Sequence, residues 1–205
     1  MGKLEIYEYN QGEEIPYAEI TNILNKSYHE YEDAGLDYAA ATQDIETTKK
    51  RMENAHCIVV KDADVIVGSL TYKIYIREEV QKRKWYEDNR IATIEQLAVL
   101  PEYRDSKAML LMGIYMLRRL MKSPEHIESV IIDTSCEAKR LVRAYVGIGF
   151  QIVDLKSWET TNYYSYIFRG TLNGRKYSDR YCQLRFAISS FCVKMQYDKY
   201  GKKRI

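Results

Sequence analysis

The sequence lacks any long apolar run. Nowhere in its 205 residues is there a stretch that approaches the roughly 18 uninterrupted apolar residues needed to span a membrane. The first five residues, Met1 to Glu5, also lack the apolar core of a secretory signal. These absences predict a cytoplasmic protein with no membrane partner.

Residues that commonly bind metals are few and scattered. The chain has 4 cysteines and 3 histidines, with no Cys-x-x-Cys pair and no histidine at ligand spacing, so no metal site is expected. No histidine lies beside a serine or cysteine that the spacing would nominate as a nucleophile. We interpret the cysteines as buried free thiols. They are Cys57, Cys136, Cys182 and Cys192.

Neither sign of charge dominates. The 31 Lys and Arg residues nearly balance the 29 Asp and Glu residues, which leaves a net charge of +2 and gives no support for a nucleic-acid partner. We interpret three short basic clusters, at 49–51, 82–84 and 202–204, as solvated surface. Since 46% of the residues are hydrophobic, the chain can bury one sizeable core. We expect one domain over residues 1–170, with a tyrosine-rich extension over 171–205.

Hydrophobic periodicity predicts a mixed α/β fold. Alternating or β-branched segments predict strands, and apolar positions at helical spacing predict helices. Thr42 and Ser106 or Asp105 are expected caps, and Gly35 and Gly147 or Gly149 expected terminators. The expected strands are 4–9, 57–61, 65–76, 91–100, 130–133, 150–155 and 163–169; the expected helices are 15–32, 44–54, 106–122 and 137–146. Asp62-Ala63-Asp64 is an expected hairpin turn, 77–90 a charged loop, and 178–197 a helix or a strand pair, with the helix favoured.

The connection from the fourth expected strand to the third expected helix is a candidate anion site. The strand leads through Pro101-Glu102-Tyr103-Arg104 into a strongly apolar helix. The first N–H groups of a helix are unpaired and carry partial positive charge, so they can bind a phosphate or pyrophosphate. Arg104 and Lys107 would add positive charge there.

Two segments about 40 residues apart resemble the GNAT acetyltransferase superfamily. Ile94-Glu95-Gln96-Leu97-Ala98-Val99-Leu100-Pro101-Glu102-Tyr103-Arg104 resembles the family's fourth strand and the approach to its cofactor loop. Ala144-Tyr145-Val146-Gly147-Ile148-Gly149-Phe150 resembles the end of a later family helix. The expected order of elements matches as well, so the resemblance covers residues 4–169. It implies a mostly antiparallel mixed sheet flanked by helices, followed here by a C-terminal extension.

The resemblance implies a cofactor, acetyl-CoA, and roles for particular residues. The main chain of Leu97, Ala98 and Val99 would pair with its pantetheine arm. The pyrophosphate would be held by a loop and helix terminus formed by Arg104, Asp105, Ser106, Lys107, Ala108 and Met109. Tyr145 would protonate the departing thiolate. The family usually has small residues where this chain has Lys107 and Met109. Small residues let the phosphate approach the backbone closely, so this chain departs from the family pattern at these two positions.

Deprotonation of the acceptor amine requires a base or a water path. Glu95 is the candidate base, because apolar strand neighbours could partly bury it and raise its pKa. Thr93 and Asp133 are also expected near the site. The resemblance implies that residues 15–54 and the 77–90 loop line the acceptor side. These segments mix acids with aromatics, which favours a cationic acceptor such as a polyamine, an aminosugar or a lysine.

The sequence leaves three functions open. The first is an N-acetyltransferase that transfers an acetyl group directly from acetyl-CoA to a primary amine. The second is a non-catalytic binding or assembly module whose tail, from Tyr177 to Tyr200, docks on a partner or on a second copy to form a homodimer. The third and weakest is an acyltransferase acting on aminoacyl-tRNA through the basic clusters.

Overall fold

The fold is that of a computed structural model, which describes residues 3–10, 12–76, 88 and 90–172. The chain divides into two compact units, residues 1–74 with 92–123 and residues 75–91 with 124–205. The expected element at 178–197, and all of the expected 77–90 loop except 88 and 90, lie outside the described residues. The division into a domain over 1–170 and an extension stays a prediction.

The first unit contains strands in the order β1-β2-β3-β4. Strands β1 and β2 pair antiparallel, as do β2 and β3. Ala63, with a φ of 53°, lies in the expected hairpin turn. At the end of β4 the Leu100 N–H donates to the Val67 carbonyl of β3 at 2.9 Å. These strands are β1 (Leu4–Tyr9), β2 (His56–Asp62), β3 (Val65–Ile76) and β4 (Arg90–Val99), of which the last two residues of β3 and the first two of β4 fall in the second unit.

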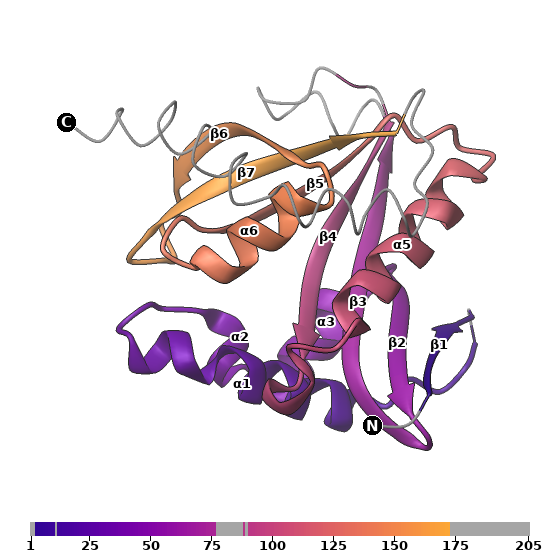
Figure 1. The fold of residues 1–205 in the computed structure, drawn as a ribbon, viewed down its shortest axis with the longest axis horizontal. Coiled ribbons are helices and arrows are strands. Elements are labelled where there is room, and N and C mark those ends of the chain that lie inside the picture. Colours follow the sequence, from indigo (N-terminus) through magenta and orange to yellow (C-terminus); the bar gives the residue numbers. More distant parts are fainter. Residues whose placement is uncertain (1–2, 11, 77–87, 89, 173–205) are drawn as a thin grey trace. The chain divides into compact units, whose positions relative to one another are not determined.

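Helices of the first unit pack on one another and on its strands. Helices α2 (Ala39–Thr42) and α3 (Ile45–Met52) contact α1 (Tyr17–Asp33), and α5 (Ala108–Met121) packs against β1 and β2 (Figure 1). Met112, Met116, Leu117 and Leu120 bury one side of α5 completely or nearly so. Burial of each such side chain contributes about 1.5–3 kcal/mol, which fixes the helix on the sheet.

Helix ends show where local expectations held and where they were wrong. Gly35 follows α1 with a φ of 78°, as expected for a terminator. The cap of α3 is Asp44, whose side chain accepts the Thr47 N–H at 2.7 Å, and not Thr42, which belongs to the unexpected short helix α2. α5 begins at Ala108, two residues later than expected. The connection before it is a 3-10 turn at Pro101–Tyr103 followed by a turn and a bend over residues 104–107, so Ser106 is not yet helical.

In the second unit, the described residues from 124 to 172 form antiparallel strands and a helix. The strands β5 (Ser129–Ser135), β6 (Gln151–Ser157) and β7 (Tyr164–Thr171) lie in the order β5-β7-β6. Helix α6 (Lys139–Gly147) ends through Gly149, with a φ of 101°, where the Gly149 N–H donates to the Val146 carbonyl and the Phe150 N–H to the Tyr145 carbonyl. Ile91, Ile131 and Ile167 form a buried cluster.

The predicted mixed α/β class with mostly antiparallel strands is confirmed. Cys57 and Cys136 are buried free thiols, as expected, whereas the other two cysteines lie outside the described residues. Of the helices in the described ranges, none combines the length and the apolar character that crossing a membrane requires.

Candidate functional site

The second half of β4 is the predicted cofactor strand. Leu97 and Ala98 are buried there and Val99 is half-buried. The Tyr28 hydroxyl of α1 donates to the Leu97 carbonyl at 2.9 Å, and the Ser27 hydroxyl donates to the Val99 carbonyl at 2.9 Å. Backbone carbonyls alternate in direction along a strand, so these two share one edge of β4. Two side chains of α1 therefore contact the strand edge directly.

The connection after β4 supplies the predicted pyrophosphate segment. Lys107 is exposed at the N-cap of α5 and makes no side-chain capping bond. Ser106 instead accepts the Ala108 N–H through its hydroxyl at 3.1 Å. Ala108 is fully buried and Met109 is half-buried, whereas Lys107 is exposed. Lys107 therefore presents an accessible positive charge at this terminus. The first turn of a 14-residue helix beside an exposed ammonium fits a phosphate-bearing ligand.

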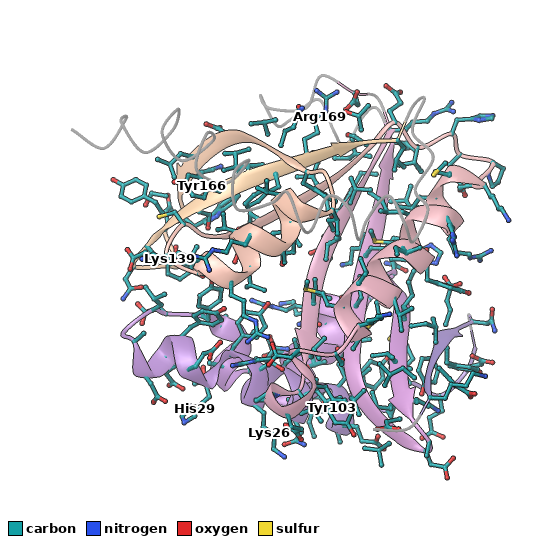
Figure 2. The ribbon with its side chains drawn as sticks, in the orientation of Figure 1. Lys26, His29, Tyr103, Lys139, Tyr166 and Arg169 are labelled. Atoms are coloured by element: carbon teal, nitrogen blue, oxygen red, sulfur yellow. The ribbon has the colours of Figure 1, made fainter. Side chains whose placement is uncertain are left out.

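Arg104 has a different environment from the one expected. Its Nη1 lies 2.5 Å from Glu30 Oε2, and its Nη2 donates to the Ser27 carbonyl at 2.8 Å. The Arg104 side chain is only 18% exposed. Figure 2 shows Lys26 and His29, which flank Ser27 and Tyr28 on α1, in the same region as Tyr103, the neighbour of Arg104. The guanidinium is therefore paired within the protein, and Asp105 next to it is exposed.

Glu95 and Thr93 contact each other on β4. The Thr93 hydroxyl donates to Glu95 Oε1 in a short hydrogen bond. Thr93 is buried, but Glu95 is exposed, so the expected partial burial of this carboxylate is wrong. Its neighbours Ile94 and Leu97 are half-buried and buried, as expected for a strand with apolar positions. Asp133, on β5 of the second unit, is exposed.

Tyr145 belongs to α6 in the second unit. Only 3% of it is exposed, and its ring packs edge-on against Phe168 with centroids 5.3 Å apart. The ring also lies 6.4 Å from that of Phe150, the last residue of the second motif. These contacts fix the direction of the phenol. They also show that Tyr145 has a packing role in the unit's core, whatever its chemical role.

Sequence reasoning missed three α1 residues that hold the cofactor strand and loop. Ser27, Tyr28 and Glu30 contact partners 72, 69 and 74 residues away. No local pattern predicts such contacts. The periodicity of α1 identifies which face of the helix is buried, but it does not identify the strand that packs against that face. Tyr28 also packs against Tyr31 and Tyr38, with ring centroids 5.9 and 5.1 Å away.

No metal-binding group stands out in the described ranges. Clusters of three or more His, Cys, Asp or Glu side chains that could hold an ion do not occur among residues 3–10, 12–76, 88 and 90–172.

A family model described as "Acetyltransferase (GNAT) family" matches residues 17–150. This range includes both sequence motifs and all candidate site residues. No curated protein matches the chain by sequence.

Solved structures share the fold at low identity. The Arabidopsis thaliana NAA60 structure with a bisubstrate analogue is 14% identical, covers 84% of this chain and 100% of its own, and has a TM-score of 0.60. The same values apply to NAA60 with acetyl-CoA. The Escherichia coli ribosomal-protein-S18-alanine N-acetyltransferase is 9% identical, with 85% and 100% covered and a TM-score of 0.62. FeeM, an N-acyl amino acid synthase from uncultured soil microbes, is 15% identical, with 93% and 99% covered and a TM-score of 0.63.

Proposed function

Because the chain belongs to the GNAT acetyltransferase family, we propose that it transfers an acetyl group from acetyl-CoA directly to a primary amine. The observation that carries this proposal is the family match over residues 17–150, which spans both motifs. The structures of NAA60 with acetyl-CoA and with a bisubstrate analogue support the same donor for a related fold.

Acetyl-CoA, when bound, supplies an acetyl group activated as a thioester. The β4 edge at Leu97 and Val99 would hold the pantetheine arm, beside the carbonyls that accept the Tyr28 and Ser27 hydroxyls. Ala98, between them, presents its carbonyl to the opposite edge, near Gly68 of β3.

The exposed Lys107 and first-turn N–H groups of α5 other than that of Ala108, which donates to the Ser106 hydroxyl, would hold the pyrophosphate, since both present positive charge. In this assignment the charge of Lys107 partly compensates for the absence of the small residues that are usual in this loop.

Two side chains are assigned proton transfers. Glu95 accepts a proton from the acceptor amine, because a neutral nitrogen is the nucleophile. The short bond from Thr93 restrains that carboxylate. Tyr145 donates the proton that the departing sulfur requires, and its packing against Phe168 keeps the phenol in one direction. The role of Tyr145 rests on its position in the second motif, and that of Glu95 on its being a carboxylate on β4 beside the candidate cofactor strand.

The acceptor is a primary amine, of a small molecule or of a lysine side chain. The segment from Ser27 to Gln43 contains four acids and no Lys or Arg. Glu30 is paired with Arg104, and the other three acids favour a cationic acceptor. We expect the reaction to take place in the cytoplasm, with acetyl-CoA as the donor and a small molecule or a protein side chain as the acceptor.

The alternative is a non-catalytic binding module that kept the fold. Two observations favour it: Lys107 and Met109 replace small residues, and Arg104 is paired with Glu30. Calorimetry with acetyl-CoA separates the two proposals. Micromolar binding supports the enzyme, and no heat of binding at millimolar ligand refutes it.

Turnover of Tyr145→Phe tests the acid role. We expect kcat to fall about 10²-fold with acetyl-CoA affinity unchanged, because the substitution removes only the hydroxyl. Circular dichroism and the unfolding midpoint check that the packed ring still supports the fold. Full activity in this variant would show that Tyr145 is not the proton donor.

A further inference from the structure

Arg104 connects the loop after β4 to α1. Its guanidinium binds two α1 groups at once, the Glu30 carboxylate at 2.5 Å and the Ser27 carbonyl at 2.8 Å. Most of the Arg104 side chain is buried. A planar guanidinium is suited to such a fixed, two-partner contact. The positive charge that the loop motif would offer to a phosphate is thus already paired with a carboxylate.

The same turn of α1 holds the strand before the loop. Ser27 and Tyr28 donate to the carbonyls of Val99 and Leu97, both at 2.9 Å. We call Ser27, Tyr28, Glu30 and Arg104 the α1 clamp. All four residues belong to the first unit, and together they fix α1 against one edge of β4 and against the connection to α5.

We propose that Arg104 is a positioning residue for the donor site and not a ligand of the pyrophosphate. Through its bonds to Glu30 and Ser27, Arg104 holds α1 in a fixed position against β4. This contact in turn sets the position of the strand edge at Leu97 and Val99. This inference rests on the proposed function, in which that edge pairs with the pantetheine arm. The pyrophosphate is then bound by Lys107 and the α5 terminus.

Glu30 distinguishes positioning from direct binding. If Arg104 bound the pyrophosphate, Glu30 would compete for the guanidinium, and its neutralisation would strengthen donor binding. If Arg104 acts through the clamp, removal of either partner releases α1 and weakens donor binding. The two mechanisms therefore predict opposite signs for Glu30→Gln.

The experiment uses the full chain with Glu30→Gln, Arg104→Gln and the double variant. Glu32→Gln is the matched control, because this α1 acid is 46% exposed in its side chain against 44% for Glu30 and lies 3.3 Å from His29 of the same helix. Hydrogen exchange of the α1 amides, without ligand, reports the clamp itself. Calorimetry with acetyl-CoA reports its effect on the donor site.

We expect both single variants to exchange α1 amides about tenfold faster and to bind acetyl-CoA about tenfold more weakly, as for the loss of a hydrogen bond between charged groups. The double variant should be no worse than either single one, because the residues act as a pair. Arg104→Lys, which keeps the charge but not the two-partner contact, should lie between.

Several results would overturn the proposal. These are tighter acetyl-CoA binding by Glu30→Gln, exchange unchanged in both single variants, additive losses in the double variant, or equal effects of Glu32→Gln. If the unaltered chain binds no acetyl-CoA, the proposed function fails, and the exchange data still decide whether Arg104 fixes α1. If Arg104→Gln does not fold, Arg104→Lys and Glu30→Gln carry the same comparison.

Discussion

Glu8 is a largely buried carboxylate at which four elements of the first unit meet. Its side chain, 9% exposed, accepts the Tyr115 hydroxyl at 3.1 Å and the Tyr72 hydroxyl at 3.4 Å, and lies 2.9 Å from Arg119 Nε. His56 Nδ1 is 3.8 Å away, and the His56 ring stacks on Tyr72. These contacts join β1 to β2, β3 and α5. We expect Glu8→Gln to destabilise the protein substantially.

The magnitude follows from the number of bonds that the amide cannot keep. A glutamine oxygen has two lone pairs and can keep the Tyr115 and Arg119 contacts of Oε2, although without the negative charge. The NH₂ group in place of Oε1 cannot accept the Tyr72 hydroxyl. Each hydrogen bond to a charged group contributes about 1.5–3 kcal/mol, and the pair with Arg119 is discounted because that side chain is 57% exposed. The expected loss is about 2 kcal/mol.

Urea unfolding at pH 7 measures this loss. With a slope of about 2 kcal/mol per molar, the midpoint should fall by about 1 M. Glu5→Gln is the matched control: it makes the same change on the same strand, but Glu5 is 67% exposed and pairs with the exposed Lys3. We expect the control to change stability by less than about 0.5 kcal/mol.

Equal midpoints for the two variants would refute the reasoning. So would a loss in Glu8→Gln that disappears at about 0.5 M salt, because screening weakens exposed pairs far more than buried ones. Tyr115→Phe should give a smaller loss, about 1 kcal/mol, since the carboxylate keeps its other donors.

Three further predictions concern close packing, the thiol and the donor site. A Cβ at Gly68 would lie 3.0 Å from the Ala98 carbonyl oxygen, so Gly68→Ala should displace β4. We expect the free energy of unfolding in urea to fall by about 1–3 kcal/mol and acetyl-CoA binding to weaken. Wild-type values for both measurements would show that the sheet accommodates the methyl group. Burial, and secondarily the Glu8 carboxylate, raises the pKa of Cys57 from 9.0 to about 12. Above pH 9 the unfolded thiol loses its proton and the folded thiol keeps it, so stability should fall by about 4 kcal/mol by pH 12 relative to Cys57→Ala; parallel pH profiles would contradict this. Lys107→Gln should weaken acetyl-CoA binding about fivefold, as measured by calorimetry. Lys122→Gln, at the other end of α5, should leave binding unchanged. Equal effects of the two substitutions would exclude a local phosphate contact at Lys107.

Local elements followed from the sequence because their causes lie within a few residues. The helix spacing of α1, the positive φ of Gly35 and Gly149, and the turn between β2 and β3 are all short-range effects. Errors occurred where two local signals competed, as when Asp44 capped α3 in place of Thr42. The two motifs were likewise visible in the sequence, and the family match now includes them. The roles of their residues remain predictions.

Only the tertiary structure decided which side chains meet across the chain. Periodicity indicated that α1 has a buried face, but not that Tyr28 reaches the Leu97 carbonyl or that Glu30 neutralises Arg104. In β1, the Glu8 carboxylate is bound by side chains of β3 and α5, which lie far from it in the sequence. The sequence thus determined the elements and the family, through short-range propensities and motifs. The environment of each charged side chain depended on contacts between residues some 40 to 110 positions apart, which form only when the chain folds.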